Sequence, residues 1–213
     1  MFLVSVSGAC SRSGKTALAE TMIRACPPGS ALAVKFTTTE EVFKRCPRGT
    51  ACVVCDIDVP FRIVTEKALL EQPGTDTERL GSAGARRVIW AIARQSAVET
   101  AWAAVKATLG DASHVVMEGT TIVDLARPDI HLFVVHPFLS PARWKPLQAR
   151  FVRAADAVVV NRPSGETRPA SPDVLASLAA LGAGPDVRVA DVSLPLAEWA
   201  PDLHERLAPL VAC

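Results

Sequence analysis

The sequence contains no tyrosine, and only 5% of its 213 residues are aromatic. Its core must therefore be built from valine, isoleucine, leucine and alanine. Such a core suits the buried strands of an α/β protein better than an aromatic-rich sandwich or a stacking platform for single-stranded bases. An excess of one charge is also lacking, because 23 Lys and Arg balance 22 Asp and Glu and leave a net charge of +1. This balance removes the long-range attraction expected of a protein that binds nucleic acid or an anionic membrane.

Long hydrophobic runs are absent as well, since no stretch approaches the roughly 18 apolar residues of a membrane span. The apolar opening, Met1–Cys10, has no preceding basic region and runs into Arg12 and Lys15, so it predicts a buried first strand and not a signal peptide. No serine stands in a nucleophile-elbow pattern. We therefore expect a cytoplasmic protein with neither a membrane nor a nucleic acid among its partners.

Apolar runs recur at intervals too wide for hairpins and alternate with stretches of helical spacing. The predicted strands are Phe2–Ser7, Ala31–Phe36, His114–Glu118, His131–Val135, Ala157–Asn161 and Val187–Ala190. The predicted helices are Lys15–Cys26, Gln95–Leu109, Arg143–Arg153 and Pro172–Leu181. This alternation predicts βαβ crossovers, and hence an α/β protein of three layers with a mostly parallel central sheet flanked by helices. A length of about 150 residues per domain makes residues 1–213 a single domain.

Two regions break this rhythm. Residues 37–83 are long, contain a cysteine cluster and show no clean period, so we expect a functional excursion there. Residues 195–213 carry leucines and a tryptophan at helical spacing, which predicts a terminal helix packed on the body of the domain.

The strongest motif is Ala9-Cys10-Ser11-Arg12-Ser13-Gly14-Lys15-Thr16, placed between an apolar strand and a helical segment. In that context the pattern predicts a phosphate loop, in which consecutive backbone N–H groups surround phosphate oxygens at a helix N-terminus. Gly14 would allow close approach, Lys15 would reach the terminal phosphates, and the Thr16 hydroxyl would bind Mg²⁺. The predicted nucleotide-binding residues of the loop are Ser11, Arg12, Ser13, Gly14, Lys15, Thr16 and Ala17.

Three segments together resemble the molybdopterin-guanine dinucleotide biosynthesis B (MobB) family. They are Val4–Thr16 with the loop, Pro73–Arg79 followed by Ala83-Gly84-Ala85, and Val115–Gly119. The resemblance implies a P-loop NTPase of the GTPase-like kind that binds GTP with Mg²⁺, hydrolyses it slowly and often forms a homodimer. It also implies an accessory role in molybdenum-cofactor or related metallocofactor biosynthesis, with a biosynthetic enzyme as partner. The chain departs from the family where a Lys-His element is expected, since it reads Lys35-Phe36 there.

A Mg²⁺-dependent phosphate site needs a carboxylate near Thr16. Glu118 is the first candidate, because it ends an apolar strand at the edge where ligands bind in open α/β sheets. The resemblance implies that Asp76 lies in a loop facing the terminal phosphate, as a metal ligand or a residue that positions water. Asp56, which follows the short apolar run from Cys52, is a rival. With Lys15, we assign catalytic roles to Asp76 and Glu118.

Asn161 ends the run Ala157–Val160, where GTPases place an Asn-Lys-x-Asp loop that reads the base. Its amide can both accept from and donate to a purine edge. The aspartate that distinguishes guanine is missing from that spacing, because the chain continues Arg162-Pro163-Ser164. GTP and ATP therefore both remain open as ligands.

Cys46, Cys52 and Cys55 form the cysteine cluster, and the last two make a C-x2-C pair. Soft thiolates favour Zn²⁺ or an iron–sulfur cluster, with Asp56, Asp58, Cys10 or a partner supplying a further ligand. Buried thiols on a Val-rich strand and a redox-active pair are the alternatives.

Three functions fit these patterns. The first is a nucleotide-dependent accessory protein of metallocofactor assembly. The second is an ATP-dependent kinase, or a ligase of the dethiobiotin-synthetase kind, on the same scaffold. The third is a non-catalytic nucleotide sensor whose cysteine segment binds a partner. Nucleotide preference and the rate of turnover separate the first two.

Overall fold

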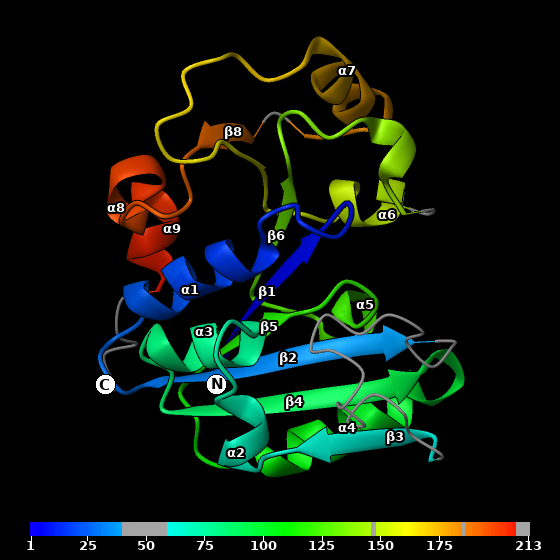
Figure 1. Ribbon diagram of the computed structural model, residues 1–213, viewed down its shortest axis with the longest axis vertical. Helices are drawn as coiled ribbons and strands as arrows, with labels where there is room; N and C mark the ends of the chain where they lie inside the picture. Colours follow the sequence, from blue (N-terminus) through cyan, green and yellow to red (C-terminus); the bar gives the residue numbers. More distant parts are fainter. Residues whose placement is uncertain (40–58, 146–147, 185, 208–213) are drawn as a thin grey trace.

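An eight-stranded sheet forms the centre of the computed structural model, which describes residues 1–39, 59–145, 148–184 and 186–207 (Figure 1). The strands are β1 (Phe2–Gly8), β2 (Ala31–Thr39), β3 (Phe61–Val64), β4 (Arg87–Arg94), β5 (His114–Glu118), β6 (Ile130–Val135), β7 (Ala157–Asn161) and β8 (Val187–Ala190). Their order is β3-β4-β2-β5-β1-β6-β7-β8. All neighbouring strands are parallel except the pair β3 and β4, which is antiparallel.

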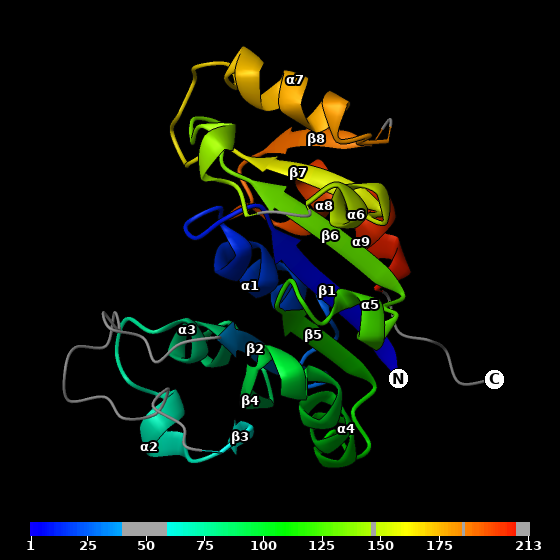
Figure 2. The ribbon, with the colours of Figure 1, turned by 90° about the vertical axis from the view of Figure 1, so that its right-hand side faces the viewer.

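Helices cover both faces of this sheet. They are α1 (Lys15–Ala25), α2 (Lys67–Leu70), α3 (Asp76–Ser82), α4 (Val98–Thr108), α5 (Val123–Ala126), α6 (Gln148–Arg153), α7 (Pro172–Ala180), α8 (Leu196–Trp199) and α9 (Pro201–Arg206). Side chains of α1, α3, α8 and α9 share one core with the sheet, while α4, α6 and α7 pack into cores on the other face. Figure 2 shows α1 and α3 on one side of the central strands and α4 on the other. The predicted three-layer α/β fold is confirmed.

The pleat of the strands decides which side chains reach the functional edge. Alternate residues of a strand face the same side. Ala33 of β2 and Val116 of β5 belong to the core beneath α1, so Lys35 and Glu118, two residues further along, also lie on the α1 face. The register pairs Lys35 with Glu118. Because parallel strands end at the same edge, both side chains lie close to the start of α1.

The six predicted strands are confirmed, most of them within a residue or two at each end. β4 was not predicted, although its residues Ile89–Ala93 are buried without interruption. A short apolar run of this kind has no period that separates a buried strand from a buried helix. β2 continues to Thr39, and β3, α2 and the whole of α3 also lie within residues 37–83, the segment expected to be an excursion.

The C-terminal segment differs from the expected single helix. Two short helices, α8 and α9, meet at Ala200, whose backbone is extended in φ at −147°. Pro201 follows, and a proline is accommodated at the first position of a helix but not inside one. None of the helices in the described ranges has the length and apolarity needed to cross a membrane.

Candidate functional site

The candidate phosphate loop, Ala9–Gly14, joins the end of β1 to the start of α1 in the middle of the sheet. Two backbone hydrogen bonds fix its first residue, since the Ala9 N–H donates to Val134 O at 3.1 Å and the Lys145 N–H donates to Ala9 O at 2.9 Å. The turn is tight, because Arg12 and Gly14 both have positive φ, at 64° and 101°. The loop therefore curls at the carboxyl edge of the sheet, where ligands bind in open α/β folds.

This loop carries a set of unused hydrogen-bond donors. Among the described residues, no protein acceptor receives the backbone N–H groups from Ser11 to Ala17. The Ser13 hydroxyl is fully buried and has no partner there either. The first N–H groups of a helix lack intrahelical acceptors and carry a partial positive charge, so an anion can receive them. The geometry is that of an anion-binding cradle.

Lys15 adds a charge to the cradle. Its Nζ donates to Cys10 O at 2.7 Å, so the side chain folds back over the loop that precedes it. Burial lowers the pKa of Lys15, and the positive charges of Lys35 and Lys145 act in the same direction against the attraction of Glu118. A lysine held among other cations and facing unpaired donors is suited to bind a polyanion.

Thr16 meets two carboxylates. Its Oγ1 lies 3.0 Å from Asp76 Oδ1 and 3.1 Å from Glu118 Oε2. A single hydroxyl proton serves one acceptor at a time, so the two contacts are alternatives. Asp76 is the first residue of α3, a helix that begins after the capping residue Thr75, whose hydroxyl accepts from the Glu78 N–H at 3.3 Å. Asp76 thus lies at a helix start and not in an extended loop.

Lys35 was not predicted as a site residue, yet it lies between these carboxylates. Its Nζ is 2.7 Å from Asp76 Oδ2 and 2.5 Å from Glu118 Oε1. Burial disfavours its charge, but the charges and hydrogen bonds of Glu118 and Asp76 hold the pKa of Lys35 above its ordinary value. Lys35 in turn holds the pKa of Asp76 below its ordinary value, against the opposing effect of burial. The available signal was a lysine inside the apolar strand ALAVKF.

The donor set of this cluster fits Mg²⁺ with a nucleotide. Mg²⁺ prefers oxygen ligands and is usually bound by one or two carboxylates together with water and substrate phosphates. Thr16, Asp76 and Glu118 offer a hydroxyl and two carboxylates next to the cradle. Within the described ranges no group of three or more His, Cys, Asp or Glu could hold a metal ion by itself. A cation here would therefore take its remaining oxygens from water or from a bound ligand.

Asn161 lies at the end of β7, against the loop. A Cβ built on Gly14 would be 2.1 Å from Asn161 Nδ2, so this side chain packs directly on the Gly14 backbone. The positive φ of Gly14 already excludes most other residues at that position. The loop, its glycine and Asn161 therefore form one continuous surface.

The cysteine cluster of Cys46, Cys52 and Cys55, with Asp56 and Asp58, lies outside the described residues. Cys10 and Cys26 are described, and both are buried free thiols. Burial raises the pKa of Cys26 to about 12, which keeps that thiol protonated and unreactive.

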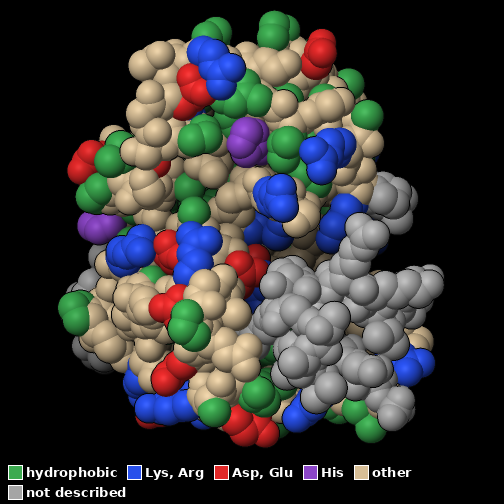
Figure 3. Space-filling model, in the orientation of Figure 1, with side chains coloured by type: hydrophobic (Ala, Val, Ile, Leu, Met, Phe, Trp, Pro, Cys, Tyr) green, Lys and Arg blue, Asp and Glu red, His purple; other side chains and the backbone are tan. Residues whose placement is uncertain are grey.

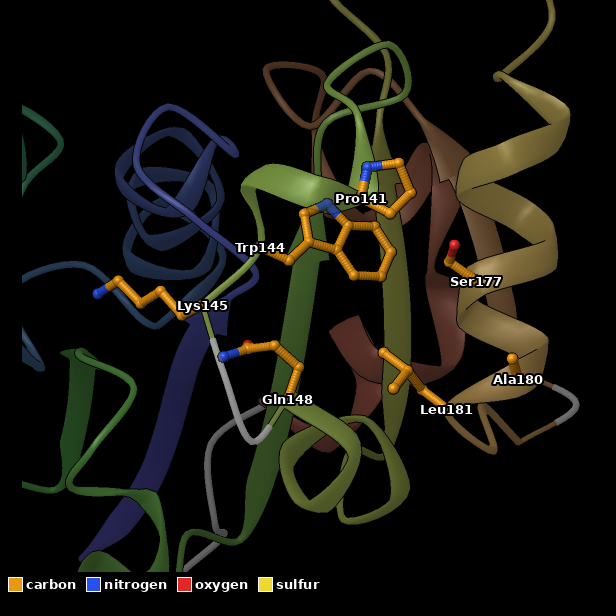
Figure 4. Close-up of a pocket in the computed structure, with 7 residues that line it drawn as sticks. All are labelled: Pro141, Trp144, Lys145, Gln148, Ser177, Ala180 and Leu181. Carbon is orange, nitrogen blue, oxygen red and sulfur yellow. The ribbon is translucent and has the colours of Figure 1, made fainter.

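Lys and Arg side chains gather across the middle of the molecular face that carries the loop, with acidic side chains among them (Figure 3). A separate cavity of about 330 Å³ lies between the segment after β6 and α7 (Figure 4). Its lining residues are Pro141, Trp144, Lys145, Gln148, Ser177, Ala180 and Leu181. Figure 4 shows the side chain of Lys145 directed away from this cavity, whose lining is largely apolar, so the cavity and the cradle are distinct.

No protein-family model matches the chain, and no curated protein matches its sequence closely enough to indicate a relationship. The interpretation of the site therefore depends on its own chemistry.

Proposed function

We propose that the chain binds a purine nucleoside triphosphate together with Mg²⁺, GTP being favoured, and hydrolyses it slowly. One observation carries this proposal: the loop N–H groups, which meet no acceptor in the described part of the chain, lie with Lys15 directly beside a hydroxyl and two carboxylates. The first half of this arrangement suits phosphate oxygens, and the second suits a hard divalent cation.

Each residue has a definite task in this proposal. The N–H groups of Ser11–Ala17 and the ammonium of Lys15 receive the phosphates, while Thr16, Asp76 and Glu118 hold Mg²⁺ directly or through water. When bound, Mg²⁺ would neutralise negative charge on the terminal phosphates. In this proposal the carboxylate of Asp76, which is about half exposed at the start of α3, would orient a water molecule at the terminal phosphate.

The biological role follows the resemblance of the sequence to the molybdopterin-guanine dinucleotide biosynthesis B family. We propose slow turnover in the cytoplasm as an accessory step of metallocofactor assembly, with a biosynthetic enzyme as partner and a homodimer as the assembly.

A second function, an ATP-dependent kinase or ligase, is favoured by one observation at the base side. Asn161 lies against Gly14 where a base-reading residue is expected, but Arg162-Pro163-Ser164 follow it instead of the guanine-selecting aspartate pattern. An amide alone can pair with adenine as well as with guanine.

A titration of the full chain with GTP and with ATP, each with and without Mg²⁺, tests the proposal. We expect Mg²⁺-dependent binding of GTP in the micromolar range with feeble turnover. Preferential binding of ATP with fast consumption stimulated by a small molecule would favour the kinase or ligase. Binding of neither nucleotide would overturn both functions.

A further inference from the structure

The cluster of Thr16, Asp76 and Glu118 already holds a cation, the ammonium of Lys35. Nζ contacts one oxygen of each carboxylate, and the other oxygen of each carboxylate contacts Thr16 Oγ1. The ammonium therefore lies between the same two carboxylates that would hold a divalent ion, on the side facing β2.

Burial makes this pairing important. The side chains of Lys35 and Glu118 are only 16% and 2% exposed, so water alone cannot solvate either charge well. Removal of one partner from such a pair leaves a buried charge uncompensated. A second cation arriving at the carboxylates would meet the ammonium at close range, and two cations repel each other more strongly in a partly buried site than in water.

We propose that Lys35 is a built-in counter-ion that occupies the divalent-cation position of the Thr16–Asp76–Glu118 cluster and is exchanged for Mg²⁺ when the nucleotide binds. This inference rests on the proposed function for the identity of the exchanged cation. It also predicts that the nucleotide acts before Mg²⁺ can bind. The Lys35 ammonium blocks the two carboxylates until it gains another anionic partner.

The candidate phosphate loop supplies the place for that partner. Lys15 and Lys35 are close enough for their charges to affect each other, so the unused donors of the loop and the Lys35 ammonium belong to one electrostatic unit. A triphosphate on the loop would bring negative oxygens to this unit and compete for Lys35. Binding of the nucleotide and binding of Mg²⁺ are therefore coupled through this one side chain, and coupling of this kind acts equally in both directions.

A titration with Mn²⁺ in the absence of nucleotide tests the exchange, with free Mn²⁺ followed by electron paramagnetic resonance. The variant Lys35→Met keeps the length of the stem and removes the charge. Lys106→Met is the matched control, because Lys106 is exposed on α4 and its loss changes the net charge equally. We expect Lys35→Met to bind Mn²⁺ roughly 10- to 100-fold more tightly than the wild type, and Lys106→Met to bind like the wild type.

Equal or weaker binding of Mn²⁺ by Lys35→Met would overturn the proposal, as would tight binding by the wild type. Lys35→Gln, whose amide can still donate to one carboxylate, is the second variant and should shift the affinity in the same direction. Folding of Lys35→Met only in the presence of Mn²⁺ would support the exchange. Failure of both variants to fold at any Mn²⁺ concentration would make Lys35 a purely structural residue. Because no nucleotide is present, these results stand apart from the test of the proposed function.

Discussion

Two buried polar clusters lie on opposite faces of the central strands, and they differ in charge and in access. On the α1 face, Lys35, Asp76 and Glu118 bring one cation and two anions together. On the other face, Ser7 Oγ and His131 Nε2 form a neutral pair 2.7 Å apart. The Asp76 side chain is 47% exposed, whereas Ser7 and His131 are 0% and 2% exposed.

This difference distinguishes the charged cluster, a candidate ligand site, from the Ser7–His131 pair, a structural contact. Ser7 and His131 pair with each other in the interior of the sheet, where neither side chain reaches solvent, so the pair serves packing. Within the described residues, His131 Nδ1 has no further hydrogen-bond partner. The charged cluster has a surplus of negative charge, an opening at Asp76 and the unpaired donors of the candidate phosphate loop beside it. Buried polarity therefore indicates function here only where charge is unbalanced and solvent can reach it.

The largest effect is expected for Glu118→Gln, which removes a negative charge from the cluster of Lys35, Asp76 and Glu118. Mg²⁺-dependent turnover should fall by at least about 100-fold, since even residues that only support a metal ligand affect activity by 10- to 100-fold. Asp111→Asn makes the same chemical change at a carboxylate that is 91% exposed, and turnover should not change. Undiminished Mg²⁺-dependent turnover in Glu118→Gln would remove Glu118 from the mechanism.

An intermediate effect is expected for Gly14→Ala, which distorts the loop without touching a charge. Its Cβ would collide with Asn161, and φ of +101° is strained for alanine. Strain of about 1–3 kcal/mol corresponds to roughly a ten- to hundredfold loss of nucleotide affinity, measured by calorimetry. Gly29→Ala meets a similar φ of +71° with no atom within 4 Å, so it should lower stability and spare nucleotide binding. Equal affinities in the two variants would show that the Gly14–Asn161 contact is unimportant.

The smallest effect is expected for the Ser7–His131 pair, and it is an effect of pH on the free energy of unfolding. Burial lowers the pKa of His131, against the attraction of Asp156 and Asp124. His131 therefore stays unprotonated in the native state at pH values where the unfolded chain, with the ordinary histidine pKa of 6.5, binds a proton. The free energy of unfolding consequently falls as the pH falls. Between about pH 7.5 and about pH 5.5, His131 should contribute a loss of up to about 1.4 kcal/mol.

Urea unfolding of the wild type and of His131→Gln at the two pH values measures this contribution. The amide does not titrate, so the variant should lose about 1 kcal/mol less on acidification. Burial also lowers the pKa values of His114 and His136, but both remain in the variant and cancel in the comparison. Identical pH dependence in the two proteins would show that His131 does not carry the effect, and altered nucleotide binding would contradict a purely structural pair.

The fold and part of the site can be predicted because they depend on features that are contiguous in the sequence. The loop from Ala9 to Thr16 is a contiguous motif, and Glu118 ends an uninterrupted apolar strand, so both stand out without any knowledge of the fold. Lys35 could not be placed in the same way, because its partners lie 41 and 83 residues away and meet it only through strand order and register. The contact between Gly14 and Asn161 is equally non-local, since it depends on β6 lying next to β1 and β7 lying next to β6.

The most direct test of the central claim is a calorimetric titration of the full chain and of Lys15→Ala with Mg²⁺ and GTP. We expect micromolar binding by the wild type and a loss of at least about 100-fold in the variant, because a partly buried ammonium is removed from the phosphates. Lys106→Ala, on the exposed side of α4, should bind like the wild type. Undiminished binding by Lys15→Ala, or no binding of GTP or ATP by the wild type, would contradict the proposed nucleotide site.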